Sequence, residues 1–239
     1  MPLYEAGIVA ELKEDRTPVT VADRSAELAM REFLERECPG HGVLGEEFGE
    51  TLGDGRHRWI LDPIDGTASF IRHVPRFGTL VGLERDGVPV VGVIACHAAG
   101  ETAWAATRMG AHLNGEQIRV SEAERLRGSV VSSSVLTRSP AHMLPAVGAL
   151  VREGARFQTW GDCYGYLMVA AGRAEVMLDP VMSIWDLVAL YPVITEAGGQ
   201  ITTWGGEPGP GDSAIATNGL LHEAVLEAIR GADKGKGRR

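Results

Sequence analysis

Two carboxylates close together in the chain are the residues best suited to chemistry. Asp62 and Asp65 follow an apolar run and are separated by Pro63 and Ile64. Proline fixes φ and lacks an amide donor, so the carbonyl of Ile64 can turn to the same side as the two acids. Carboxylate and carbonyl oxygens are the ligands that hard divalent cations such as Mg²⁺ take in proteins. This stretch is therefore a candidate metal site.

The two residues that follow suit an anion. Gly66 lets backbone come close to a ligand, and Thr67 is typical of a helix start, where free N–H groups accept anions. Oxygen ligands beside such a turn predict a Mg²⁺-dependent phosphate site. An isolated D-x-x-D is more often a strand end with a helix cap. The whole run over 59–67, with a second acidic motif upstream, favours the metal site.

Three further acids could reach this site. Glu46 follows a short apolar stretch; adjacent acids at a turn are usually solvated, but hard cations take oxygens from several loops. Asp186 lies beside Trp185 at the start of an apolar helix, where an acid commonly complements the helix dipole. Asp23 either caps the first helix or holds Thr67 by a hydrogen bond, and the sequence leaves both open.

Composition limits the class of protein and its partners. The chain has 239 residues, 44% of them hydrophobic, and a formal net charge of −9. The acidic balance argues against nucleic acid and anionic membranes as partners, and a phosphate ester would be repelled unless cations intervened. We find no apolar stretch of membrane-spanning length and no signal-peptide pattern, and the odd number of scattered cysteines is typical of reduced thiols. These features predict a cytoplasmic location.

The elements that position the acids follow from periodicity and turn signals. We expect a helix over 21–38, then a mainly antiparallel sheet with a hairpin at Asp86–Gly87. Beyond about residue 126, strands and helices alternate. The expected strands are 43–44, 58–61, 78–84, 88–96, 101–107, 129–134, 157–160, 174–178, 200–203 and 213–217. The expected helices after the first are 140–152, 163–171, 184–197 and 220–230.

The predicted class is therefore α/β, with α+β character in the first half. Residues 1–239 are expected to form one catalytic unit of two halves. Residues 1–125 would contribute a helix and an antiparallel sheet carrying most metal ligands. Residues 126–239 would contribute Asp186 and the substrate-facing segment.

Three motifs in this order resemble the inositol monophosphatase family of Mg²⁺-dependent phosphatases. They are Gly-Glu-Glu at 45–47, Asp-Pro-Ile-Asp-Gly-Thr at 62–67, and Trp-Asp at 185–186 leading to Glu-Ala-Gly-Gly at 196–199. The resemblance covers about residues 11–230. It implies a layered α/β/α/β/α sandwich, Mg²⁺ or Mn²⁺ as cofactor, a small phosphorylated substrate and a homodimer. Family members usually begin with a long helix, which this chain would lack or keep only in very short form.

The resemblance also implies roles for individual residues. The side chain of Asp62 would bridge two metal ions. Thr67, oriented by Asp23, would position the attacking water together with Glu46, and the N–H groups of Gly66 and Thr67 would hold phosphate oxygens. Paired cations activate water and stabilise the leaving alkoxide, so no nucleophilic Ser or Cys is needed. The implied metal ligands are Glu46, Asp62, the carbonyl of Ile64, Asp65 and Asp186.

Segments outside the metal motifs resemble the histidinol-phosphatase branch of this family. They are Gly-Asp-Cys-Tyr at 161–164, the stretch 176–180 and the stretch 27–49. The resemblance implies L-histidinol phosphate as substrate, and Asp162 and Asp179 are placed to receive its amine and imidazole. The alternatives are a helix cap for Asp162 and a surface turn for Asp179. Many relatives carry the longer Glu where this chain has Asp179, so the carboxylate of Asp179 reaches less far than theirs.

Other functions remain open at this point. The first is a general inositol or sugar monophosphatase. The second is a non-catalytic partner in transcription or ribosome assembly, which the acidic composition disfavours. The third is an inactive relative, which the full set of acids disfavours.

Overall fold

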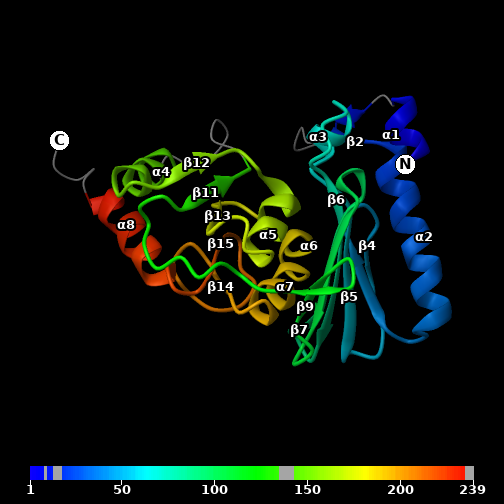
Figure 1. Cartoon of the computed structure of the whole chain (residues 1–239). Coiled ribbons are helices and arrows are strands. Elements are labelled where there is room, and N and C mark those ends of the chain that lie inside the picture. The colour runs from blue at the N-terminus through cyan, green and yellow to red at the C-terminus, as the bar shows by residue number, and fades with distance from the viewer. Residues whose placement is uncertain (8–9, 13–17, 135–142, 235–239) are drawn as a thin grey trace.

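Five layers make up the molecule (Figure 1). The computed structural model describes residues 1–7, 10–12, 18–134 and 143–234. A helix covers one face of an eight-stranded sheet, three helices separate that sheet from a five-stranded one, and two helices cover the far side. The predicted α/β/α/β/α sandwich is confirmed. In that order the helices are α2 (Val21–Glu37), then α5 (Asp162–Ala170), α6 (Ile184–Leu187) and α7 (Leu190–Glu196), then α4 (Met143–Arg152) and α8 (His222–Lys234).

The eight-stranded sheet has the order β10-β9-β8-β7-β6-β5-β3-β4. The predicted hairpin at Asp86–Gly87 joins β6 to β7. The turn at Asn114–Gly115 joins β9 to β10, two short strands that sequence patterning missed. The strands are β3 (Gly42–Gly45), β4 (Gly49–Thr51), β5 (His57–Asp65), β6 (Gly78–Arg85), β7 (Val88–Cys96), β8 (Glu101–Ala106), β9 (Ala111–Leu113) and β10 (Glu116–Ile118).

One pair in this sheet is parallel, and it matters for the site. β4 returns along the outer edge of β3, so β5 enters on the other side of β3 and runs parallel to it. The register pairs Gly45 with Leu61. The next residues along the two strands, Glu46 and Asp62, therefore leave the same end of the sheet.

β5 is longer than the sequence predicted. The expected strand ended at Leu61, whereas the observed strand continues through the acidic motif to Asp65. Its pairing with β6 shifts register between Asp62 and Asp65, which accommodates Pro63 and its missing amide donor. The hydroxyl of Thr79 on β6 donates to the Pro63 carbonyl at 2.8 Å. The motif is thus held in the sheet rather than in a free turn.

The second sheet has the order β12-β11-β13-β15-β14, with mixed strand directions. The helix predicted over 184–197 is wrong as one element, because α6 ends at Leu187 and α7 begins at Leu190. Pro192 has no N–H to donate to the Val188 carbonyl, which breaks the helical ladder there. The strands are β11 (Val130–Ser133), β12 (Arg156–Gln158), β13 (Val176–Asp179), β14 (Gln200–Thr202) and β15 (Ala214–Thr217).

Short elements complete the fold. The N-terminal helix α1 has five residues, which agrees with the expectation of a very short one. The start of the predicted helix 140–152 lies outside the described residues. Within the described ranges, no helix is both long and apolar enough to cross a bilayer. The remaining elements are α1 (Pro2–Ala6), β1 (Glu11–Leu12), β2 (Pro18–Val19), α3 (Thr67–Phe70) and a 3₁₀ turn (His97–Ala99).

The two halves meet in very close contact. The largest buried cluster lies between the sheets and includes Ile94, Leu167 and Leu190. There, a Cβ added to Gly92 on β7 would lie 1.9 Å from the carbonyl oxygen of Ala189, between α6 and α7. Only a glycine lets the two backbones approach this closely.

We expect Gly92→Ala to destabilise the fold. The new methyl would overlap backbone, which cannot move away without shifting a layer, so the cost should reach about 1–3 kcal/mol or more. Gly148→Ala, inside α4 and 3.4 Å from the flexible end of Arg152, is the matched control and should leave stability unchanged or raise it. Thermal unfolding of both variants measures this. A melting temperature for Gly92→Ala equal to that of the wild type would contradict the contact.

Candidate active site

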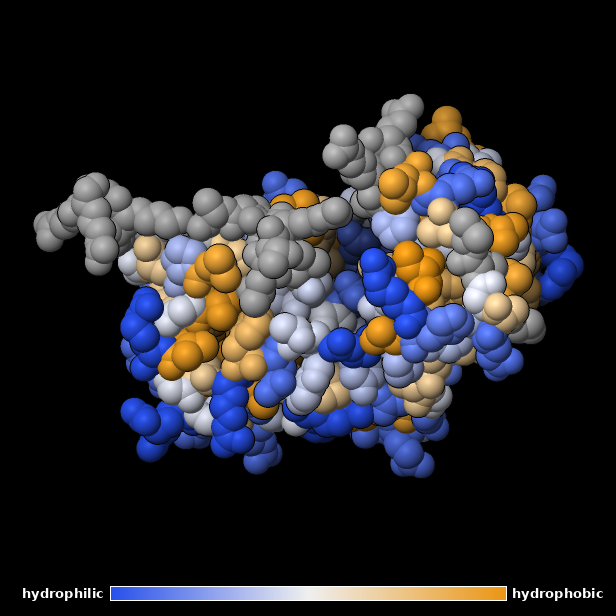
Figure 2. Space-filling view, turned by 90° about the horizontal axis from the view of Figure 1, so that it is seen from above, coloured by the Kyte–Doolittle hydropathy of each residue, from blue (hydrophilic) through white to orange (hydrophobic). Residues whose placement is uncertain are grey.

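Three carboxylates from the two halves converge at the end of β5. Asp62 and Asp65 belong to β5, and Asp186 belongs to α6. One oxygen of each lies within 4.8 Å of the others. This end of β5 lies at the side of the molecule that carries α3, the next element in the chain (Figure 1). Figure 2 views that side and shows hydrophilic residues between the two halves.

Burial and mutual repulsion disfavour the charges of these acids. Burial, followed by the charges of neighbouring acids, raises the pKa of Asp62 and of Asp65 well above the usual range. Burial also raises the pKa of Asp186 to about 6. Like charges crowded into a buried space oppose ionisation unless a cation balances them.

Glu46 joins this cluster from β3. Its backbone N–H donates to the Leu61 carbonyl at 3.1 Å, which ties it to the residue before Asp62. A side-chain hydrogen bond and the charge of Glu46 both contribute to the raised pKa of Asp62. The charge of Glu46 also raises the pKa of Asp186. The parallel pairing of β3 and β5 thus brings in the fourth predicted acid.

Backbone amides orient the three converging acids. Ile64 N–H donates to Asp62 Oδ1 at 3.0 Å, and Cys163 N–H, in the first turn of α5, donates to Asp65 Oδ2. Ser183 N–H donates to Asp186 Oδ2 at 2.7 Å as part of a capping box at α6. Such donors favour the ionised carboxylate and fix its direction.

Asp23 performs both tasks that the sequence left open. Its Oδ2 accepts the Thr20 N–H at 2.8 Å in a capping box at the start of α2. Its Oδ1 accepts the hydroxyl of Thr67 at 3.2 Å. The same hydroxyl also lies 3.0 Å from the carbonyl of Ile64. Because a hydroxyl has one proton, these two acceptors share it, and the lone pairs of Thr67 Oγ1 remain acceptors.

The turn between β5 and α3 requires glycine. Gly66 has φ of 83°, a left-handed conformation. A Cβ there would lie 3.0 Å from both the Arg76 carbonyl oxygen and Asp162 Oδ2. The carboxylate of Asp162 is therefore directly beside this turn.

Asp162 and Asp179 extend the acidic region on the α5 side. Burial raises the pKa of Asp162 to about 6 and that of Asp179 to about 7. Asp179 is 6% exposed and accepts the Tyr166 hydroxyl at 2.9 Å, so the surface-turn alternative is wrong. The cap of α5 is Gly161 without a side-chain cap bond, so the helix-cap alternative for Asp162 is wrong as well.

A hard divalent cation fits this donor set. The available ligand atoms are carboxylate and carbonyl oxygens, with the Ile64 carbonyl next to the acids, and no sulfur or imidazole belongs to the converging set within the described residues. Such ions take oxygen ligands from several loops. A cation would also relieve the repulsion that raises the pKa of the acids.

The whole chain matches one family of known proteins. Residues 2–234 match the model of the inositol monophosphatase family. The chain belongs to this family. Its relatives include the histidinol-phosphatase of Mycobacterium tuberculosis, 42% identical over 92% of this chain and 87% of that protein. The histidinol-phosphatase of Chlorobaculum parvum is 38% identical over 93% of this chain and 87% of that protein.

Solved structures agree with this membership. The extragenic suppressor protein suhB from Bartonella henselae superposes with a TM-score of 0.88 at 30% identity, over 95% of this chain and 90% of that one. An inositol monophosphatase from Zymomonas mobilis gives a TM-score of 0.85 at 31% identity, over 96% and 90% of the two chains. The inositol monophosphatase family is metal-dependent, in agreement with the acidic cluster.

Some residues that hold the acids of this site in place were not found from the sequence. The capping box of Ser183 with Asp186 was detectable, because S-x-x-D before an apolar helix is its signature. The hydrogen bond from the Cys163 N–H to Asp65 joins residues that are 98 positions apart in the chain, and no local sequence pattern predicts it. Glu27 was missed because an acid four residues before Arg31 is typical of an exposed helix pair.

We expect Asp65→Asn to stabilise the metal-free protein while abolishing turnover. The neutral amide removes one of the repelling charges and keeps an acceptor for Cys163 N–H, but it removes an anionic ligand. Melting temperatures with and without Mg²⁺, together with phosphate release, measure this. The variant should melt at or above the wild-type temperature without metal and should gain little from added Mg²⁺. Wild-type turnover would contradict the prediction.

Proposed function

We propose that this chain is a metal-dependent phosphomonoesterase that hydrolyses L-histidinol phosphate to L-histidinol and inorganic phosphate. The observation that carries the proposal is the similarity to proteins named histidinol-phosphatase, at 38–42% identity over 90–93% of the chain. The converging acids at the end of β5 supply the chemistry that such a reaction needs.

The proposed cofactor is Mg²⁺, with Mn²⁺ able to replace it. Bound cations of this kind polarise phosphate oxygens and acidify water. The cluster has only oxygen donors and partly buried acids, which supports this choice. The residues that would hold the cations are Glu46, Asp62, the carbonyl of Ile64, Asp65 and Asp186.

The chain's own groups would position the reactants. Gly66 and Thr67 begin α3, and their N–H groups would hold phosphate oxygens. The Thr67 hydroxyl donates its hydrogen bond to Asp23 or to the Ile64 carbonyl, so its oxygen would accept a hydrogen bond from the attacking water. Glu46 would orient the same water from the β3 side. Phosphoryl transfer depends mainly on such positioning and on electrostatic stabilisation.

The substrate's cationic end would bind on the α5 side. Asp162 lies beside the Gly66 turn, and its charge raises the pKa of Asp179, so the two acids are neighbours. Burial raises the pKa of both acids, and the charge of Arg76 offsets only part of this rise at Asp162. An amine or imidazolium placed there would favour their ionised forms. In this proposal residues 1–125 supply most of the metal ligands, and residues 126–239 supply Asp186 and the two specificity acids.

An inositol or other polyol phosphate is the second candidate substrate. The inositol-1-monophosphatase of Rhizobium meliloti is 35% identical over 92% of this chain and 85% of that protein. A neutral polyol, unlike histidinol, would bring no positive charge to Asp179 and would leave Asp162 with the charge of Arg76 alone.

A substrate panel separates the two candidates. We expect kcat/KM for L-histidinol phosphate to exceed that for inositol 1-phosphate by at least about tenfold, since each charge-assisted hydrogen bond to the substrate contributes roughly 1.5–3 kcal/mol. Phosphate release measured with Mg²⁺, and again after its removal by a chelator, gives the comparison. Equal or reversed preference would favour the polyol.

Asp162→Ala tests the specificity role. Loss of this carboxylate should raise KM for histidinol phosphate about tenfold or more while changing KM for inositol 1-phosphate little. Asp162→Asn, which keeps the shape and removes the charge, should behave in the same way. Glu116→Ala on the exposed strand β10 serves as the control and should match the wild type. Equal losses on both substrates would refute a charge-specific contact.

Two further expectations from the sequence stay predictions. Homodimer formation rests on the family resemblance alone, and light scattering of the purified protein tests it. The cytoplasmic location rests on the composition and on the scattered cysteines of the sequence.

A further inference from the structure

We propose that Glu27 is a positioning residue for the metal site. Together with Arg31 it clamps the turn between β3 and β4, so that Glu46 faces Asp62. This inference rests on the proposed function, because it assigns Glu46 to the cation. Among the described residues, the hydrogen bonds of Glu27 go to the turn and to Arg31 and not to the three converging acids.

Glu27 reaches the turn from the middle of α2. Its side chain is fully buried, with 0% exposure. Its Oε2 accepts the Glu47 N–H at 2.7 Å, and its Oε1 accepts the Phe48 N–H at 3.3 Å. A Cβ added to Gly45 would lie 2.0 Å from Oε1, so the strand end makes room for this carboxylate. The acid thus fills the space under the turn and satisfies two of its amides.

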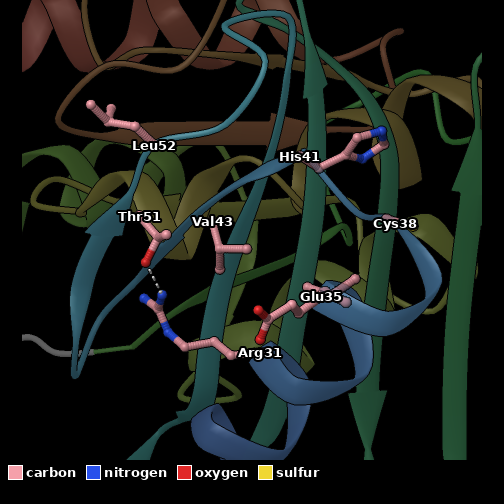
Figure 3. A pocket seen from close by; sticks show the side chains of 9 residues that line it. Arg31, Glu35, Cys38, His41, Val43, Thr51 and Leu52 are labelled. Carbon is pink, nitrogen blue, oxygen red and sulfur yellow. Dashed lines mark hydrogen bonds between the residues drawn. The ribbon is translucent and has the colours of Figure 1, made fainter.

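Arg31, one turn further along α2, completes the clamp. Its Nε donates to Glu27 Oε1 at 2.8 Å. Its Nη1 donates to Thr51 Oγ1 at 3.1 Å, a bond that spans from α2 to β4 in Figure 3, and its Nη2 donates to the Gly49 carbonyl. The ion pair therefore holds both the start and the end of the turn.

Glu46 is fixed from both sides as a result. Its own N–H donates to the carbonyl of Leu61 on β5, which fixes the backbone position of Glu46 next to Asp62. The next two amides are bonded to Glu27. With its backbone held before and after, the direction in which the Glu46 side chain leaves the turn is set. Groups that orient metal ligands in this way commonly alter metal affinity strongly when removed.

Glutamine cannot replace the carboxylate of Glu27, because a side-chain amide has only one acceptor oxygen. This difference provides a specific test. Both oxygens of Glu27 accept hydrogen bonds from donors. An amide has one acceptor and one NH₂, so the NH₂ would meet either the N–H of Glu47 or the N–H groups of Arg31 and Phe48. If Arg31 is removed, the NH₂ can turn toward the vacated space. A cavity of about 370 Å³ adjoins Arg31 between α2 and β4, so water can reach the space (Figure 3).

The experiment measures Mn²⁺ binding to the metal-free protein by calorimetry. Glu27→Gln should weaken Mn²⁺ binding about 10–100-fold, and Arg31→Ala about tenfold. The double variant should lose less Mn²⁺ affinity than the two single losses multiplied together predict. The clash with Arg31 Nε is then gone, and only the longer contact with the Phe48 N–H, 3.3 Å in the wild type, remains. Amide exchange of residues 47 and 48 in metal-free Glu27→Gln should be faster than in the wild type, which reports the clamp without using activity.

Val225→Ala is the matched control. It removes buried atoms from α8 in the second half and should lower the melting temperature without changing Mn²⁺ affinity. The inference fails if Glu27→Gln binds Mn²⁺ as the wild type does, or if Val225→Ala weakens binding equally. If Glu27→Gln does not fold, wild-type affinity in Arg31→Ala would overturn it. Absence of Mn²⁺ uptake by the wild-type protein would instead overturn the proposed function.

Discussion

Repulsion among buried carboxylates is the constraint on which the site depends. Asp62, Asp65 and Asp186 come from different halves of the chain, yet their oxygens lie within 4.8 Å of one another. Nothing in their own chemistry would bring them together, and burial makes each charge more costly. The surrounding fold holds them by other means. Two sheets pack on shared helices, strand register aligns β3 with β5, and backbone amides point at each acid. Stability gained elsewhere thus maintains a cluster that a cation can neutralise.

Local signals in the sequence predicted much of this arrangement. The hairpin at Asp86–Gly87 and the helix beginning at Val21 follow from periodicity and turn residues, whereas the order of layers was implied by the family resemblance. The acids beside Pro63 were also found, because proline and glycine restrict the backbone in a recognisable way. The length of β5 was not predicted. Its continuation to Asp65 depends on pairing with β6, and an acid followed by a proline locally suggests a strand end.

The features that sequence reasoning missed either join residues far apart in the chain or have a local pattern that fits two structures equally well. Glu27 four residues before Arg31 looks like an exposed helix pair, and only the fold shows that the acid is buried under another strand's turn. The division between α6 and α7 needed the effect of Pro192 to be weighed against a continuous apolar pattern. The contact from Cys163 to Asp65 crosses between halves. These two residues become neighbours only when the helices of the middle layer pack on the eight-stranded sheet.

The close seating of Ala189 on Gly92 has a consequence for how the protein can diversify. The backbones of the two halves meet directly at this contact, which joins the half that carries Asp62 and Asp65 to the half that carries Asp186. The acids at 162 and 179 come from α5 and from the end of β13, which take no part in this contact. Under the proposed assignment, exchange of these two acids would redirect the enzyme to a new alcohol while the proposed metal ligands and the contact between the halves stay in place.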